Sequence, residues 1–81
     1  MVGCHQYDYI EIVCLFHYPI RITLKTGLVI DGTALDTGRN DAGNECIKIQ
    51  QDASEKLVVL DKIQMLAICI ENPHFSQVDF Q

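Results

Sequence analysis

The sequence YDYIEIVCLFHY, residues 7–18, decides the fold, because its apolar residues follow a helical pattern. One helix face would carry the residues at the spacing i, i+3, i+4 and i+7: Ile10, Val13, Cys14 and His17. Pro19 disfavours helical geometry at Tyr18, so we expect the helix to end there. A helix that is apolar nearly all round needs a covering surface, and we expect the rest of the chain to supply it as a small sheet.

The other side of this helix would carry a narrow acidic edge, formed by Tyr7, Asp8, Tyr9 and Glu11. Two carboxylates beside two aromatic rings offer acceptors for Arg or Lys and flat surfaces for stacking. A basic RNA-binding groove lined by aromatic residues receives a similar combination, with phosphates for the carboxylates and bases for the rings. The alternative is that the carboxylates stabilise the helix start through its dipole and the tyrosines cover the core. The residues alone leave both interpretations open.

After Pro19, residues 20–25 and 45–50 alternate apolar and polar residues with a period of two, which is typical of β-strands. Residues 56–60 and 63–71 are apolar on both faces, which indicates strands that are covered on both sides. The expected strands are residues 20–25, 28–36, 45–50, 56–60 and 63–71, with a loop over residues 37–44. Gly27 favours a hairpin turn, and Gly32 inside the second strand indicates a sharp bend or a bulge.

One helix followed by five short strands predicts a single domain over residues 1–81. The predicted fold is mainly β with one N-terminal helix at about residues 7–18. The strands, over about residues 19–71, would form a small, strongly bent five-stranded antiparallel barrel with the layout of Sm-like proteins. Residues 72–81 are predicted to form a loose tail, with Phe75, Val78 and Phe80 as candidates for packing.

The net charge of −5, from six Lys and Arg against eleven Asp and Glu, argues against a nucleic-acid-binding protein and favours a basic partner surface. Plain solubility of a small acidic domain is the alternative explanation. The sequence contains no run of about 18 apolar residues, so we expect no membrane span. The N-terminus lacks a basic region followed by an apolar stretch, which predicts a cytoplasmic location.

Motifs for catalysis or for cofactor binding are not found. The four cysteines are Cys4, Cys14, Cys46 and Cys69, and three of them lie in apolar periodic segments, so we expect reduced, buried thiols. Cys14-x-x-His17 could contribute two zinc ligands, but its spacing fits no common four-ligand pattern. Cys14 with His17 and Ser54 with Asp52 are candidate nucleophile and base pairs, but no catalytic motif surrounds either pair. Since no glycine loop fits a phosphate either, we expect neither an enzyme nor a metal or cofactor site.

The order and spacing of several short motifs indicate a family. These motifs are Cys4, Tyr7–Asp8, Glu11, Cys14-x-x-His17, ITLKTG at residues 22–27, Ala34-x-Asp36 and Leu60–Asp61–Lys62–Ile63. Through them, from about Cys4 to Glu71, the chain resembles the Rho-binding antiterminator family, small bacterial inhibitors of transcription termination factor Rho. The resemblance departs at His5 and Gln6, where family members carry acidic residues.

The resemblance implies an Sm-like barrel with an N-terminal helix. It also implies a function, which is to bind the RNA-binding domain of Rho, block its primary RNA site and suppress Rho-dependent termination. By position, the contact residues would be Tyr7, Asp8, Tyr9 and Glu11 on the helix, with Arg39 and Asn40 in the long loop as secondary contacts. We expect a monomer with Rho as partner and no direct contact with nucleic acid. The alternative is an Sm-like RNA-binding ring, which needs a basic face and strand-edge pairing between subunits.

Overall fold

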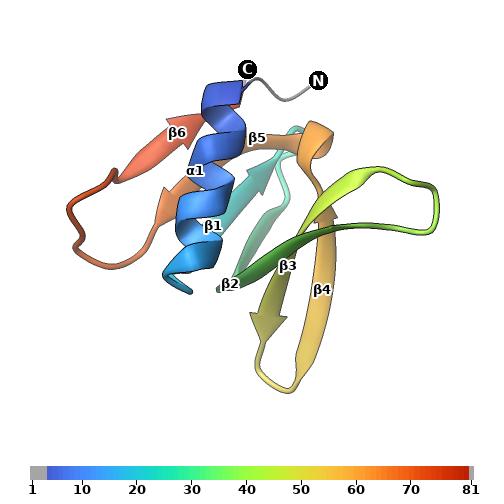
Figure 1. Ribbon diagram of the computed structural model, residues 1–81, viewed down its shortest axis with the longest axis horizontal. Helices are drawn as coiled ribbons and strands as arrows, with labels where there is room; N and C mark the ends of the chain where they lie inside the picture. The colour runs from blue at the N-terminus through green and yellow to red at the C-terminus, as the bar shows by residue number, and fades with distance from the viewer. Residues whose placement is uncertain (1–3, 81) are drawn as a thin grey trace.

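Within residues 4–80, an antiparallel sheet of six strands in the order β4-β3-β2-β1-β5-β6 forms the body of the protein, and the N-terminal α-helix packs on it (Figure 1). The computed structural model describes residues 4–80, without the side chain of Cys4. The elements are α1 (Cys4–Leu15), β1 (Pro19–Leu24), β2 (Val29–Arg39), β3 (Glu45–Gln51), β4 (Ser54–Val59), the 3₁₀ helix η1 (Leu60–Lys62), β5 (Ile63–Ile68) and β6 (Gln77–Asp79).

The prediction of a mainly β fold with one N-terminal helix is confirmed, but the strongly bent five-stranded barrel is not confirmed. The sheet has six strands, and in the described residues β4 pairs only with β3 while β6 pairs only with β5. The two outer strands therefore leave the sheet open instead of closing it into a barrel.

The sixth strand comes from the segment that was expected to be a loose tail. Asn72 turns the chain after β5, because its Oδ1 accepts hydrogen bonds from the backbone N–H groups of His74 and Phe75. The returning segment pairs with β5 and brings Phe80, only 8 % exposed, into the core. The C-terminal segment is thus held in place by the turn at Asn72 and by burial of the Phe80 ring.

The helix begins and ends three residues earlier than the pattern predicted, at Cys4 and Leu15. Its C-terminal turn has Schellman-type hydrogen bonds, from Tyr18 N–H to the Val13 carbonyl (3.0 Å) and from His17 N–H to the Cys14 carbonyl (3.2 Å). His17 takes the left-handed conformation this motif requires, with φ 52°. The helix therefore stops before the restriction imposed by Pro19 takes effect.

The core lies between α1 and the sheet. Ile10 and Val13 of α1 are fully buried, and the largest fully buried side chains of the sheet and η1 are Ile20, Ile22, Ile47, Ile49, Leu60, Ile63 and Leu66. The sheet bends strongly at two places in β2. A Cβ on Gly32 would lie 2.8 Å from the carbonyl oxygen of Gln50, so only glycine allows β2 and β3 to approach so closely. The register also shifts between Ala34 and Asp36, where Leu35 is the extra residue of a bulge.

Candidate functional site

The exposed face of α1 carries two carboxylates that bind nothing else in the described structure. Asp8 and Glu11 are both exposed, and within residues 4–80 neither forms a salt bridge. Leu15, 73 % exposed, lies on the same side of the helix. The first turn of α1 holds no acidic residue, so the helix dipole, which acts within the first turn, does not account for these carboxylates.

Tyr7 and Tyr9 do not share this face with the carboxylates. Two residues along an α-helix turn by about 200°, so the two rings lie on opposite flanks of α1. Tyr7 is half-buried against the core, and the Tyr9 ring packs edge-on against Phe75 with centroids 4.6 Å apart. The structure thus places the carboxylates outward and the rings beside them, where the rings also cover the core.

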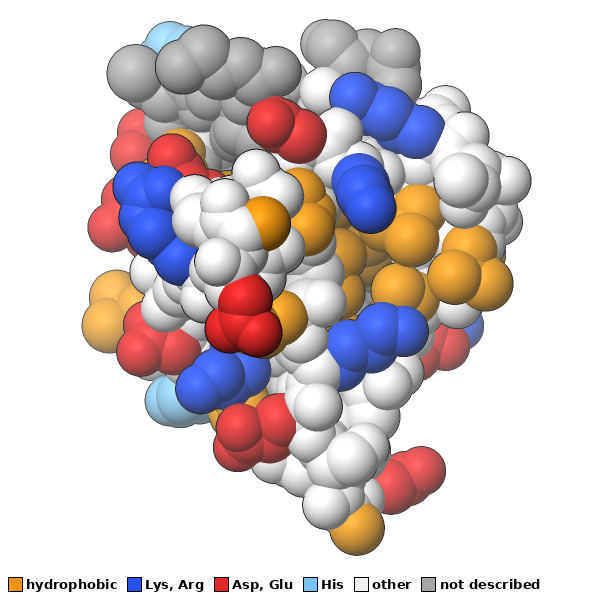
Figure 2. All heavy atoms as spheres, turned by 90° about the vertical axis from the view of Figure 1, so that its right-hand side faces the viewer, with side chains coloured by type: hydrophobic (Ala, Val, Ile, Leu, Met, Phe, Trp, Pro, Cys, Tyr) orange, Lys and Arg blue, Asp and Glu red, His pale blue; other side chains and the backbone are white. Residues whose placement is uncertain are grey.

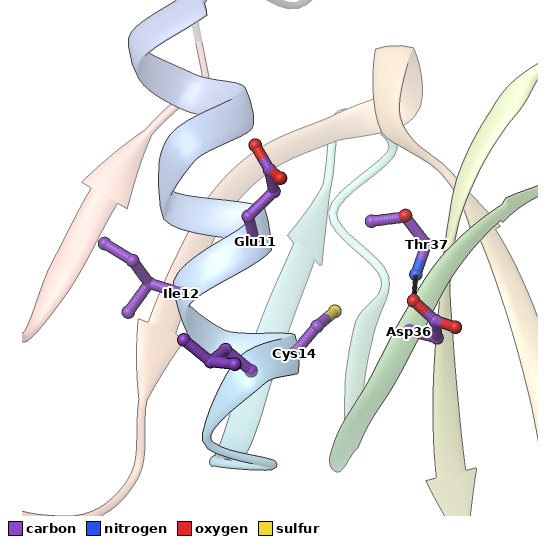
Figure 3. A pocket seen from close by; sticks show the side chains of 6 residues that line it. Glu11, Ile12, Cys14, Asp36 and Thr37 are labelled. Atoms are coloured by element: carbon purple, nitrogen blue, oxygen red, sulfur yellow. Dashed lines mark hydrogen bonds between the residues drawn. The ribbon is translucent and has the colours of Figure 1, made fainter.

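A groove of about 330 Å³ separates α1 from β2 and extends the acidic face (Figure 3). Its lining residues are Glu11, Ile12, Cys14, Leu15, Asp36 and Thr37. Glu11 of α1 and Asp36 of β2 lie on its two sides, so a third exposed carboxylate joins the two on the helix. Burial, followed by the charges of Asp36 and Glu11, raises the pKa of the Cys14 thiol from 9.0 to about 11, which keeps this thiol protonated at neutral pH.

The end of α1 is fastened to β2 at Ala34, which positions this groove. The Ala34 N–H donates to the Tyr18 carbonyl (3.0 Å), and the Nδ1–H of His17 donates to the Ala34 carbonyl (3.0 Å). Ala34 is fully buried, so a small side chain is needed under the helix end. The bulge at Leu35 then lets Asp36 reach the surface, where its Oδ1 accepts a hydrogen bond from the Thr37 N–H (2.8 Å).

Asp36 was not predicted as a site residue. Its sequence signal was only the motif Ala34-x-Asp36, which supported the family resemblance without showing that β2 passes beside α1. The pairing of a helix with a strand more than 20 residues later is a tertiary contact that periodicity does not reveal.

The loop containing Arg39 and Asn40 is shorter than predicted, because β2 continues to Arg39 and the loop covers only residues 40–44. Asn40 organises it, since its Oδ1 accepts from the N–H groups of Ala42 and Asn44, both at 3.0 Å. The guanidinium of Arg39 donates to the Gly43 carbonyl (2.7 Å). In Figure 1 this loop lies at the right and α1 at the left, so the structure does not bring Arg39 and Asn40 together with the helix carboxylates.

Zinc binding by Cys14 and His17 gains no support from their arrangement. The His17 Nδ1 bonds to Ala34, and among residues 4–80 no group of three or more His, Cys, Asp and Glu side chains is arranged to hold a metal ion. Cys14 and Cys46 are free and buried, as expected, whereas Cys69 is free but exposed, so the prediction that its thiol is buried is wrong. The Cys4 side chain lies outside the described residues. In the same part of the chain, no helix has the length and apolar character that crossing a membrane would need.

Comparison with known proteins points to one regulatory system. Residues 1–80 match the family described as modulator of Rho-dependent transcription termination (ROF). A solved structure described as YaeO bound to magnesium, from Vibrio cholerae O395, is 42 % identical, with a TM-score of 0.89, and the match covers 94 % of this chain and 99 % of that chain. No match was found among curated protein sequences.

Proposed function

This chain belongs to the ROF family of modulators of Rho-dependent transcription termination, and from that membership we propose that it inhibits termination by binding Rho directly. In this proposal it occupies the RNA-binding domain of Rho, blocks the primary RNA site and suppresses termination in the cytoplasm. Such inhibition is a protein–protein contact and requires no catalytic group or cofactor.

The observation that supports this proposal is the set of exposed carboxylates on α1 and β2. Asp8 and Glu11 have no ion-pair partner among residues 4–80, and Asp36 adds a third carboxylate across the groove. A surface that binds RNA phosphates carries Lys and Arg, so it offers partners to carboxylates held on a rigid helix. The flanking rings of Tyr7 and Tyr9 supply aromatic surface beside those charges. We retain Arg39 and Asn40 as secondary contacts, on a separate part of the molecule.

The alternative of an Sm-like RNA-binding ring fits this sheet poorly. A closed ring built by strand-edge pairing needs an available strand edge on each side of the subunit. Here β4 offers one edge, but β6 covers much of the outer edge of β5 and has only three residues itself. The net charge of −5 further disfavours RNA as the ligand. A monomer remains our expectation.

The test is a binding titration of the RNA-binding domain of Rho with the wild-type chain and with the variant Asp8→Lys/Glu11→Lys. If each carboxylate is a central contact, truncation or reversal costs roughly 1–3 kcal/mol, so the double variant should weaken Kd at least ~30-fold. Binding should also weaken with added salt, because charge pairs at the rim are screened over about 8 Å at physiological ionic strength.

The matched control is Glu55→Lys/Glu71→Lys, which changes the net charge equally at exposed positions outside the acidic face. It should retain nearly wild-type affinity. If Asp8→Lys/Glu11→Lys binds Rho as the wild type does, or if both variants lose affinity equally, α1 is not the contact surface.

A further inference from the structure

A second surface, on the side of the molecule away from α1, combines exposed apolar side chains with unpaired lysines. We call it the lysine-rimmed seam. Its apolar lining residues are Leu24, Leu28 and Ile30 from the β1–β2 hairpin and Leu57, Val58 and Val59 from β4. They surround a shallow hollow of about 140 Å³. Figure 2, which views the molecule from the right-hand side of Figure 1, shows apolar side chains with Lys and Arg side chains around them.

Several apolar side chains at the seam and beside it are exposed to solvent. Leu28 is 56 % exposed and Leu57 is 41 % exposed, and the neighbouring Val29 is 51 % exposed. A contiguous exposed apolar patch with a polar rim is typical of a protein interaction site, whereas scattered apolar residues carry no such meaning.

The charges around the seam are available to a partner. The chain has six Lys and Arg residues, and the ion pairs within residues 4–80 use Arg21, Arg39 and Lys48. The remaining three are Lys25, Lys56 and Lys62. Lys56 and Lys62 line the hollow, and the Lys25 N–H donates to the Lys62 carbonyl (2.9 Å), which places Lys25 next to Lys62. In a chain of net charge −5, the unpaired cations of the described structure therefore gather at one apolar surface.

The seam also lies where the sheet is open. Strand β4 pairs with β3 on one side, and within residues 4–80 no strand pairs with its other edge. Because β4 and the β1–β2 hairpin are not neighbours in the sheet, the hollow between them lies along an opening that an added strand could occupy. The free backbone N–H and C=O groups of an edge strand bind extended peptides in many complexes.

We propose that the lysine-rimmed seam binds an extended segment of another protein in which acidic and apolar residues alternate. The backbone of the segment pairs with β4, its apolar side chains enter the hollow, and its carboxylates reach Lys25, Lys56 and Lys62. This site is distinct from the acidic face of α1, so both surfaces can be occupied at once.

Two other occupants fit less well. Single-stranded RNA usually stacks its bases on aromatic rings, and the residues lining the hollow include none. A second copy of this chain would have to offer its own β4 or β6. Its β4 would bring a second set of seam lysines to the same surface, and β6 has the sequence Gln77-Val78-Asp79, with a single carboxylate. The chemistry of the seam therefore favours an acidic partner protein.

The test is an NMR titration of the ¹⁵N-labelled chain with a blocked nonapeptide of alternating Glu and Val residues. We expect amide shifts confined to β4 and the β1–β2 hairpin. Lys56→Gln/Lys62→Gln should weaken peptide affinity about fivefold, the loss expected for two rim charges. The matched control Arg21→Gln/Lys48→Gln has the same net charge and should change the affinity less than about twofold, since its residues lie outside the seam.

Several results would overturn the proposal. One is the absence of shifts at the seam, and equal binding of a nonapeptide of alternating Lys and Val is a further one. Another is tighter binding of a nine-nucleotide uridine RNA at the same amides, which would assign the seam to nucleic acid. The last is self-association of Lys56→Gln/Lys62→Gln without any peptide binding by the wild type, which would show that the lysines only protect an exposed edge.

Discussion

The two faces of this small domain differ in charge and in what holds them in place. The acidic face of α1 carries Asp8 and Glu11 on a helix whose other side is buried in the core. The lysine-rimmed seam carries unpaired lysines around exposed leucines at the open edge of the sheet. Other charged side chains of the strands form ion pairs within the sheet, as Arg21 does with Asp31 at 2.7 Å.

This difference shows that the charge of the chain is sorted by position. Paired charges on a sheet surface contribute little to binding, because each is already neutralised by a neighbour. Unpaired charges of one sign, gathered on one face, can steer and orient a partner of the opposite sign. The net charge of −5 is therefore the sum over a molecule that has one acidic surface and one basic surface.

The largest expected effect is on the free energy of unfolding, and it distinguishes the buried inner side of α1 from the exposed side chains of the lysine-rimmed seam. Ile10→Ala removes a fully buried side chain from the inner side of α1 and should lower the free energy of unfolding by about 2–5 kcal/mol. Leu57→Ala removes an exposed side chain of equal size and should cost less than about 1 kcal/mol. Urea unfolding of both variants measures the difference, and equal losses would show that Leu57 serves the core instead of a binding surface.

The second effect is the pH dependence of stability that follows from burial of the Cys14 thiol beside the acidic groove. Its folded-state pKa is raised to about 11 from 9.0, so the protonated thiol is favoured by folding. The contribution to stability is full below pH 9 and is lost as the pH rises from 9 through about 11, with a loss of up to about 2 kcal/mol. Stability measured between pH 8 and 11 should therefore fall less in Cys14→Ala than in the wild type. Parallel pH curves for the two proteins would contradict the prediction.

The smallest effect concerns the turn that fixes α1 against β2. His17→Ala loses the hydrogen bond to Ala34 while keeping the left-handed backbone, and should cost about 1 kcal/mol. His17→Gly loses the same bond but relieves the backbone conformation by about 1 kcal/mol, so it should be nearly neutral. Thermal unfolding compares the two variants. A glycine variant that is less stable than the wild type would show that the hydrogen bond contributes more than the conformation costs. A glycine variant that is no more stable than His17→Ala would contradict the predicted relief of the backbone.

Local patterns predicted the helix, most of the strands and the exposed carboxylates, because the spacing of apolar residues in the sequence shows the periods of 3.6 and two residues that helices and strands require. These patterns failed where a contact between residues far apart in the sequence determines the structure. The end of α1 is fastened to β2 through His17 and Ala34, and Asp36 joins the acidic face only because β2 passes beside α1.

The sequence patterns also did not predict the short strand β6 or whether the sheet closes into a barrel. Strand β6 has only three residues, too few for a clear period of two, and its order comes from the turn at Asn72 and the burial of Phe80. Whether a strongly bent sheet closes into a barrel depends on the relative tilt of its strands, which no local pattern specifies. The tyrosines were predicted on one edge with the carboxylates, although their spacing of two residues places them on opposite flanks of a helix.

The most direct test of the central claim, that the acidic face of α1 takes the place of RNA on Rho, is a competition measurement. A fluorescent single-stranded oligonucleotide is bound to the isolated RNA-binding domain of Rho, and the protein is then added. We predict that the wild-type protein displaces the oligonucleotide and that Asp8→Lys/Glu11→Lys does not. A ternary complex, with the oligonucleotide still bound beside the wild-type protein, would contradict the account.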